Sequence, residues 1–358
     1  MWIVGGGAGQ SAGVGESVAY EREREVAVGA AIAAAVVCER VRSALTPEHI
    51  MTKADGSPAT VADYASQAVI IAALRQAFPA DPIAAEETSA ALRESSHATQ
   101  QATVQRLVTA VIPGLSAQEI LDHIDGGSFI GGPGRFWTVD PIDGTKGFVR
   151  GGQYAVAIAL IEDGELILGV LACPNLPADP GRPLGPRGCV LAATAGCGAS
   201  QRALGESSEG PARVDAIDDP RAARVCVPVE RSSASPAATT RVLTHLSNPW
   251  PPMRIDSQAK YAVVARGDAS VYMRLSGHKP QNIWDHAAGV IVLREAGGTV
   301  TDTLGNPLRF SSGRVLTANQ GILASNGALH NAFLAAIRRD PPNRDSEMQR
   351  GSSFAPEP

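Results

Sequence analysis

The sequence has few of the residues that mark disulfide-bonded, zinc-binding or nucleic-acid-binding proteins. Its 358 residues include five cysteines, an odd number, and no Cys-x-x-Cys pair, so neither a disulfide framework nor a zinc site is indicated. The formal net charge of −5 leaves no basic excess for nucleic acid. The seven histidines form no His-Glu-x-x-His pair, which argues against catalytic zinc. We expect mostly buried, free thiols, as in a reducing compartment.

Long apolar runs are also missing. The longest uncharged apolar run, residues 26–38, is far shorter than the ~20 residues that a membrane span needs. Residues 1–15 contain no Lys or Arg, so they resemble neither a secretory signal nor an Arg-rich transit peptide. We therefore expect a cytoplasmic or organellar protein (chloroplast or mitochondrion) that is not secreted. Its expected partner is a small molecule, without membrane or nucleic acid, and the expected state is a monomer.

The composition is that of a globular protein, and a length of 358 residues is enough for two domains. Hydrophobic residues make up 44% and charged residues 19% of the chain. A stretch rich in Gly, Ser, Asp and Ala at 204–224 marks the expected boundary. The expected parts are a flexible tail at 1–17, an α+β domain at 18–224, an α/β domain at 225–338 and a disordered tail at 339–358. A nominal Gly-x-Gly-x-x-Ala loop at 7–12 lacks the βαβ context of a dinucleotide site.

Periodicity predicts the main elements outside the central stretch. Helices are expected at 20–45, from Asp63 to about Phe78, within 88–127, and at 237–246, 258–265, 283–295 and 329–338. A strand at 82–85, a hairpin of 155–161 with 166–171, and a strand at 189–194 belong to the first domain. Strands at 225–229, 253–255, 270–275 and near 299 and 322 alternate with helices in the second, which indicates an α/β layer.

The strongest chemical signal is the stretch 137–152, which reads WTVDPIDGTKGFVRGG. Its apolar entry predicts a strand that ends at Asp140, because Pro141 fixes φ and has no N–H for the ladder. Asp143 follows in a tight turn that Gly144 permits. Two carboxylates held so close repel each other unless a cation lies between them, and oxygen ligands suit Mg²⁺ or Ca²⁺.

The alternative for this stretch is a surface turn rich in Asp and Gly. Against that alternative stand the apolar strand entry, the proline between the acids and the hydroxyl of Thr145. Backbone N–H groups at Thr145 and Lys146 are placed to hold a phosphate. Two further acids, Glu86 after a strand and Asp285 at a helix start, are equally explained as solvated or helix-stabilising charges.

The chain resembles the inositol monophosphatase superfamily, closely at 140–145 (DPIDGT) and 284–289 (WDHAAG). Within it, the chain is similar to the 3′(2′),5′-bisphosphate nucleotidases of the plant and yeast salt-tolerance type. The stretches that carry this resemblance are DPIDGTKGFVRGGQYAVAIAL, GVLACPNLP, DSQAKYAVVARGDASVYMRL and IWDHAAG. They lie within a similarity that covers about residues 18–338. The resemblance implies a layered α/β and α+β sandwich of the inositol monophosphatase/sugar phosphatase type.

The resemblance also implies a set of site residues and an activity. Two or three Mg²⁺ ions would be bound by Glu86, Asp140, the carbonyl of Ile142, Asp143 and Asp285. Asp63 and Thr145 would activate the attacking water. The nucleotide would be held by Ser257, Lys260 and Arg274, with Thr145 and Asp285 also touching the substrate. The implied enzyme hydrolyses 3′-phosphoadenosine 5′-phosphate to AMP, and its phosphosulfate to adenylyl sulfate, in sulfur metabolism, and lithium inhibits it.

Two departures from the family pattern and two rival functions remain. Ala85 stands where the family has Gly, and residues 230–236 lack the His that the family has near the nucleotide. The nearest rival is an inositol monophosphatase or inositol polyphosphate 1-phosphatase, against which the DSQAKY stretch argues. A rival of another class is a non-catalytic nucleotide or metal sensor. The retained acid set, with Asp63 and Thr145, argues against that rival.

Overall fold

The computed structural model describes residues 19–53, 55–230, 235–275 and 281–339. The expected tail 1–17 lies outside the described residues, as does the expected tail 339–358 apart from Arg339. Within the described residues no helix is long and apolar enough to cross a membrane. All five cysteines are free thiols, and four of them are buried.

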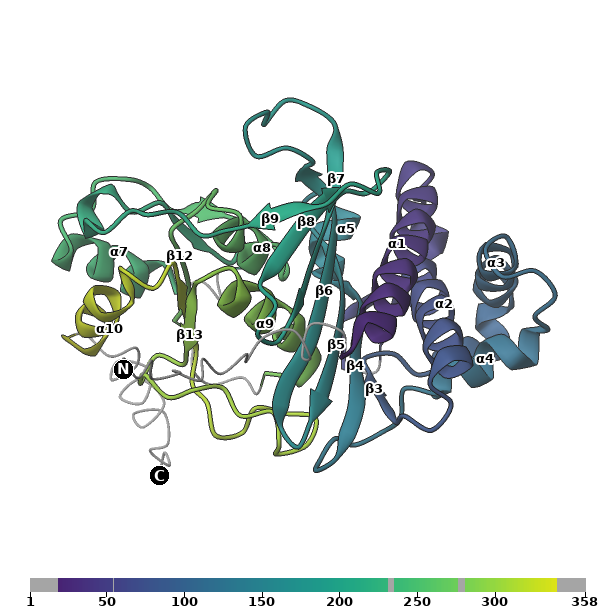
Figure 1. Ribbon diagram of the computed structural model, residues 1–358. Helices are drawn as coiled ribbons and strands as arrows, with labels where there is room; N and C mark the ends of the chain where they lie inside the picture. The colour runs from purple at the N-terminus through teal and green to yellow at the C-terminus, as the bar shows by residue number, and fades with distance from the viewer. Residues whose placement is uncertain (1–18, 54, 231–234, 276–280, 340–358) are drawn as a thin grey trace, which may run out of the picture.

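A seven-stranded sheet forms the centre of the molecule (Figure 1). Its strands pair in the order of the chain, antiparallel except for the first two. They are β3 (Ile83–Ala85), β4 (Arg135–Asp143), β5 (Ala155–Glu162), β6 (Glu165–Pro177), β7 (Arg187–Thr194), β8 (Ala199–Ala203) and β9 (Gly210–Ala212). The predicted hairpin of β5 and β6 is confirmed.

Two long helices, α1 (Glu21–Ser43) and α2 (Val61–Ala77), cover one face of this sheet. The shorter helices α3 (Ala98–Thr109) and α4 (Ala117–Asp125) pack against α2, on its far side from the sheet (Figure 1). Alanine, the best helix former, recurs through α1 and α2, and its small side chain lets the two helices pack closely. A hairpin of β1 (Ile50–Thr52) and β2 (Pro58–Thr60) joins these two helices.

A second, five-stranded sheet lies beyond the other face. Its order is β11 (Met253–Arg254), β10 (Val225–Val227), β12 (Val271–Arg274), β14 (Ile322–Ser325) and β13 (Thr299–Thr301). Its outer helices are α7 (Pro236–His245) and α10 (His330–Arg339). Between the two sheets lie α8 (Ala259–Ala265) and α9 (Ala287–Glu295).

The molecule is therefore a sandwich in which layers of helices alternate with the two sheets, as Figure 1 shows. Side-chain alternation along β5 assigns each face to its own core. Val156 and Ile158 pack with α1 and α2, whereas Ala157 and Ala159 pack with α8 and α9. The expected layered α/β and α+β class is confirmed. The apolar core around α8 and α9 includes residues from both sides of the stretch 204–224.

Two predicted boundaries are wrong, and both lie at the site. β4 does not end at Asp140 but continues past Pro141 to Asp143, because a register shift against β5 accommodates the proline. The helix predicted at 283–295 is split into the short 3₁₀ turn η5 (Ile283–Asp285) and α9. His286, with φ −138° and ψ −35°, breaks the helical path between them.

Candidate active site

The acidic side chains at the irregular end of β4 lie against the helical layer between the two sheets. Asp140 is 1% exposed, and one of its oxygens accepts a hydrogen bond from the N–H of Ile142 at 3.1 Å. Asp143 accepts from the backbone N–H of Gln258, next to α8. Gly144, with φ 85°, turns the chain into α5 (Thr145–Val149).

A third aspartate reaches the same place from the middle helical layer. Asp285 ends η5, where its carboxylate accepts from the N–H of Asn282 at 3.3 Å. Carboxylate oxygens of Asp140, Asp143 and Asp285 lie within 4.8 Å of one another. The structure thus brings together three of the predicted metal ligands, from two elements far apart in sequence.

Burial and mutual repulsion perturb these carboxylates. Burial raises the pKa of Asp143 to about 6, and burial with the nearby charge of Asp143 raises the pKa of Asp285 to about 7. The pKa of Asp140 is raised well above its usual range by burial and by the charge of Glu86. The donor set consists of oxygen atoms alone, so the residues fit a hard divalent cation and not zinc.

Glu86, the fourth predicted acidic ligand, lines a cleft that Asp143 and Thr145 also line, and its carboxylate forms an ion pair with a lysine. Lys53 Nζ donates to Glu86 Oε1 at 2.7 Å and also forms an ion pair with Glu87. Glu87 is 3% exposed, and burial raises its pKa to about 8. The sequence prediction missed Lys53, whose position in the β1–β2 hairpin is set by contacts distant in sequence.

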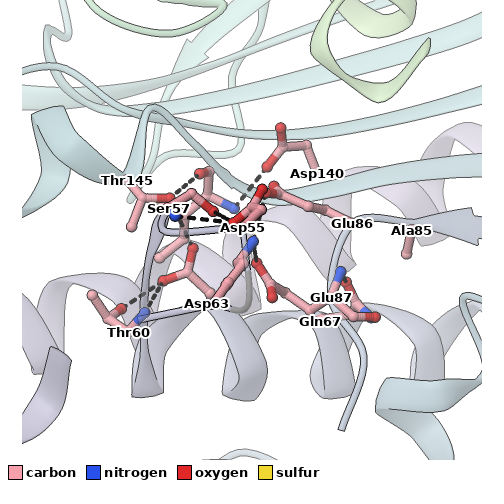
Figure 2. Close-up of polar contacts among 12 residues, drawn as sticks. Asp55, Ser57, Thr60, Asp63, Gln67, Ala85, Glu86, Glu87, Asp140 and Thr145 are labelled. Atoms are coloured by element: carbon pink, nitrogen blue, oxygen red, sulfur yellow. Dashed lines mark hydrogen bonds and ion pairs between the residues drawn. The ribbon is translucent and has the colours of Figure 1, made fainter. Parts of the chain in front are cut away.

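Asp63 and Thr145 meet as predicted, as Figure 2 shows. Thr145 Oγ1 lies 3.1 Å from Asp63 Oδ1 and 3.2 Å from the carbonyl oxygen of Ile142. The other carboxylate oxygen of Asp63 accepts from the N–H and hydroxyl of Thr60, the N-cap of α2, at 2.7 and 2.6 Å. Asp63 therefore completes a capping box and still presents one oxygen to Thr145. Burial raises its pKa to about 6.

The three predicted nucleotide-binding residues line the same cleft, which has a volume of about 250 Å³. Lys260 is 7% exposed, donates to the carbonyl of Ser257 and lies 5.2 Å from the ring centroid of Tyr272. Burial lowers the pKa of Lys260. Arg274, at the end of β12, has a buried Nε without a hydrogen-bond partner among the described residues.

A charged bridge at the mouth of the cleft was not predicted. Arg150, which follows α5, donates to Glu230 at 2.7 Å and to Asp256 at 3.0 Å. Lys146 Nζ lies 3.9 Å from Glu230. This bridge ties the helix after the aspartate turn to segments that follow β10 and β11, and no local sequence pattern signals it.

Of the two departures from the family pattern, the structure describes Ala85 but not most of the segment without His. The methyl group of Ala85 lies against Gly127. A Cβ added at residue 127 would lie 2.4 Å from this methyl group, so position 127 needs a glycine. Residues 231–234, most of the segment without His, lie outside the described residues.

Comparison with known proteins agrees with this geometry. A 3′(2′),5′-bisphosphate nucleotidase from Oryza sativa is 41% identical over 338 residues, covering 89% of this chain and 94% of its own. One from Schizosaccharomyces pombe is 38% identical over 337 residues, covering 89% and 96%. These relatives confirm the expectation of a phosphatase.

Solved structures show the same fold. The inositol monophosphatase of Anabaena matches with a TM-score of 0.58 at 25% identity, over 90% of this chain and 97% of its own. That of Thermotoga maritima matches with a TM-score of 0.60 at 20% identity, over 89% and 97%. The family model described as the inositol monophosphatase family matches residues 20–341. The chain belongs to the inositol monophosphatase family.

Proposed function

We propose that this protein is a Mg²⁺-dependent phosphatase that removes the 3′-phosphate of 3′-phosphoadenosine 5′-phosphate. The observation that carries the proposal is the contact of Thr145 with Asp63, next to three converging aspartates and a cationic cleft wall. The names of the relatives support the substrate class. Hydrolysis of the 5′-phosphosulfate, and inhibition by lithium, belong to the same proposal.

The acidic cluster is the proposed Mg²⁺ site. Asp140, Asp143 and Asp285 would supply most of the charge, and Glu86 and the carbonyl of Ile142 would complete the set for two or three ions. Bound Mg²⁺ lowers the pKa of a coordinated water and neutralises charge on phosphoryl oxygens. Lys53 is bonded to Oε1 of Glu86, so Oε2 would be the oxygen that binds the metal, and Glu87 is the second partner of that lysine.

Thr145 and Asp63 are proposed to act as one proton acceptor. When Thr145 directs its hydrogen to Asp63 Oδ1, a lone pair of its oxygen is free to accept a hydrogen bond from water. As that water attacks phosphorus, its proton passes to Thr145, whose own proton moves to Asp63. The bond from phosphorus to the 3′-oxygen breaks, and the 3′-oxygen takes a proton from a second water molecule to leave as the 3′-hydroxyl of AMP. Thr60 holds the second oxygen of Asp63, so the carboxylate keeps its orientation.

The second sheet supplies the proposed specificity. Lys260 and Arg274 provide positive charge in the cleft that Thr145 also lines, and the buried Nε of Arg274 needs an acceptor. The 5′-phosphate of a nucleotide bisphosphate is such an acceptor, since guanidinium and ammonium groups bind phosphate through charge-assisted hydrogen bonds. Ser257 would add its hydroxyl. A monophosphate has no second anion for this wall.

Phosphate release from a panel of substrates tests the proposal. The panel contains 3′-phosphoadenosine 5′-phosphate, adenosine 3′-phosphate, inositol 1-phosphate and inositol 1,4-bisphosphate, each with Mg²⁺ and with a chelator. We expect turnover only with Mg²⁺, and the highest kcat/KM for the nucleotide bisphosphate. A preference for either inositol phosphate would transfer the assignment to the rival phosphatases, and absence of turnover on all four would favour a sensor.

A further inference from the structure

A second polar cavity lies beside the catalytic cleft and shares Asp256 with it as a lining residue. Its volume is about 470 Å³, larger than that of the cleft. Three arginines from separate parts of the chain line it: Arg42 at the end of α1, Arg187 at the start of β7 and Arg254 in β11. Nothing in the catalytic scheme uses them.

The charge of this cavity is poorly compensated. Arg187 and Arg254 form no ion pair among the described residues, and their bonds go to the carbonyl oxygens of Asn175 (2.6 Å) and Val229 (3.5 Å). Arg42 forms an ion pair at 3.2 Å with Glu39, which is not among the residues that line the cavity. Asp256 is already bonded to Arg150. Guanidinium groups with free N–H groups around a cavity are suited to an oxyanion.

The side chain of Gln153 calls for a hydrogen-bond donor, which an anion without a proton does not carry. Its Nε2 donates at 3.0 Å to the carbonyl of Asn175, the oxygen that also accepts from Arg187, so the amide and the guanidinium lie side by side. The Oε1 atom of Gln153 is buried and has no partner among the described residues. Leaving a buried acceptor unpaired is costly, so a ligand that fits here must bring a hydrogen-bond donor.

We propose that this cavity binds inorganic phosphate in a protonated form. The charged oxygens would accept from Arg187 and Arg254, with Arg42 adding positive charge. The P–OH group would donate to Gln153 Oε1. Sulfate has the same shape and charge but carries no proton at neutral pH. A site built to bind a hydroxyl rejects an analogue that lacks it, so phosphate should bind more tightly than sulfate.

The cavity is also connected to the cleft. Asp256 lines both, and its partner Arg150 donates to Glu230 inside the cleft. Inorganic phosphate is a product of the reaction proposed above, so the source of the ligand rests on that proposal. Binding itself does not need turnover, so the two proposals fail in different experiments.

Titration calorimetry with inorganic phosphate tests the inference, on the full chain in the presence of a chelator. Without metal, the aspartates of the cleft repel anions, and the variants below separate the arginine cavity from Lys260 in the cleft. We expect one site. Its Kd should rise about tenfold to a hundredfold in the double variant Arg187→Ala/Arg254→Ala, which loses charge-assisted hydrogen bonds. Both side chains are exposed, and thermal melting checks that the variant is folded.

Two control variants locate the site. Arg182→Ala removes an arginine in the loop between β6 and β7, which leads to Arg187. The Arg182 side chain is 79% exposed and forms an ion pair only with Asp179 among the described residues, so the variant should leave the Kd unchanged. Lys260→Ala removes a cation of the cleft and should also leave it unchanged. Loss of binding in Lys260→Ala but not in the arginine double variant would overturn the proposal, as would absence of phosphate binding. Equal affinity for sulfate would overturn the role of Gln153.

Discussion

Thr145 Oγ1 lies 3.1 Å from Asp63 Oδ1, although the two residues are 82 positions apart in sequence. The same carboxylate caps helix α2 through its other oxygen, which accepts from Thr60. A structural and a proposed catalytic role therefore occupy different atoms of one side chain. This separation makes the two roles experimentally distinguishable.

The first prediction concerns this contact. Thr145→Ala and Asp63→Asn should each lower kcat by ~10²–10⁴-fold with little change in KM, because each removes part of one general base. The double variant should lose less than the product of the two single losses, since residues that act as a unit are non-additive. Steady-state kinetics of the three variants measures this, and fully multiplicative losses would contradict the pairing.

Thr60→Val is the matched control. It removes the capping hydroxyl but keeps the Thr60 N–H bond that orients Asp63, so it should cost ~1 kcal/mol of stability and lower kcat far less than Asp63→Asn does. A collapse of kcat in this variant would mean that the capping box, and not the contact with Thr145, sets the activity.

The second prediction concerns the metal ligands. Asp143→Asn keeps the side-chain volume but removes a charge, so it should raise the Mg²⁺ concentration needed for half-maximal activity and lower kcat at saturation. Activity titrations with Mg²⁺ measure both effects. Glu119→Gln, a charge removal in the exposed capping box of α4, should leave the titration unchanged. Activity of the wild-type chain that persists in a chelator would contradict a metal-dependent site.

The third prediction concerns pH and stability. The pKa values of Asp143 and Asp285 are raised to about 6 and about 7, above the unfolded value of ~3.9. The folded, metal-free chain thus binds more protons than the unfolded chain, and its stability should fall as pH rises through this window. We expect a loss of a few kcal/mol, at roughly 1.4 kcal/mol per unit of pKa shift, between about pH 4 and pH 7.

Denaturant unfolding at several pH values, with a chelator or with Mg²⁺, measures this loss. Mg²⁺ binds the ionised carboxylates, so it should restore more stability at pH 8 than at pH 5. A metal-free chain that becomes more stable over this range would contradict the electrostatics of the cluster.

The fourth prediction concerns selectivity. Lys260→Ala and Arg274→Ala should each lower kcat/KM for 3′-phosphoadenosine 5′-phosphate about tenfold to a hundredfold, because each loses a charge-assisted bond to the 5′-phosphate. Both variants should spare adenosine 3′-phosphate, which serves as the control substrate. Equal losses on both substrates would place the two residues at the cleaved phosphate instead.

Much of this site could be predicted because its motifs are local. The aspartates around Pro141 lie on one short segment, and the hydroxyl of Thr145 follows in the same turn. The path of the backbone through that turn could not be predicted, since a proline usually ends a strand ladder. Here the register shift against β5 keeps the strand going to Asp143.

Contacts between distant segments were beyond the reach of the sequence pattern. Lys53 binds Glu86 across 33 positions, and Arg150 binds Asp256 across 106. A single charged residue in a polar loop belongs to no periodic pattern, so its partner cannot be predicted from the sequence. Such contacts depend on how the layers stack, which only the folded chain defines.

The helical layer between the two sheets links correct folding of the chain to assembly of its active site. Asp140 and Asp143 come from the first sheet, whereas Asp285 and Lys260 belong to the layer that packs against both sheets. A partly folded chain with only the first sheet in place would hold two of the three aspartates and expose the apolar face that α8 and α9 normally cover. Turnover therefore reports the assembly of the whole sandwich, and an intermediate of this kind would be inactive and prone to aggregate at the same time.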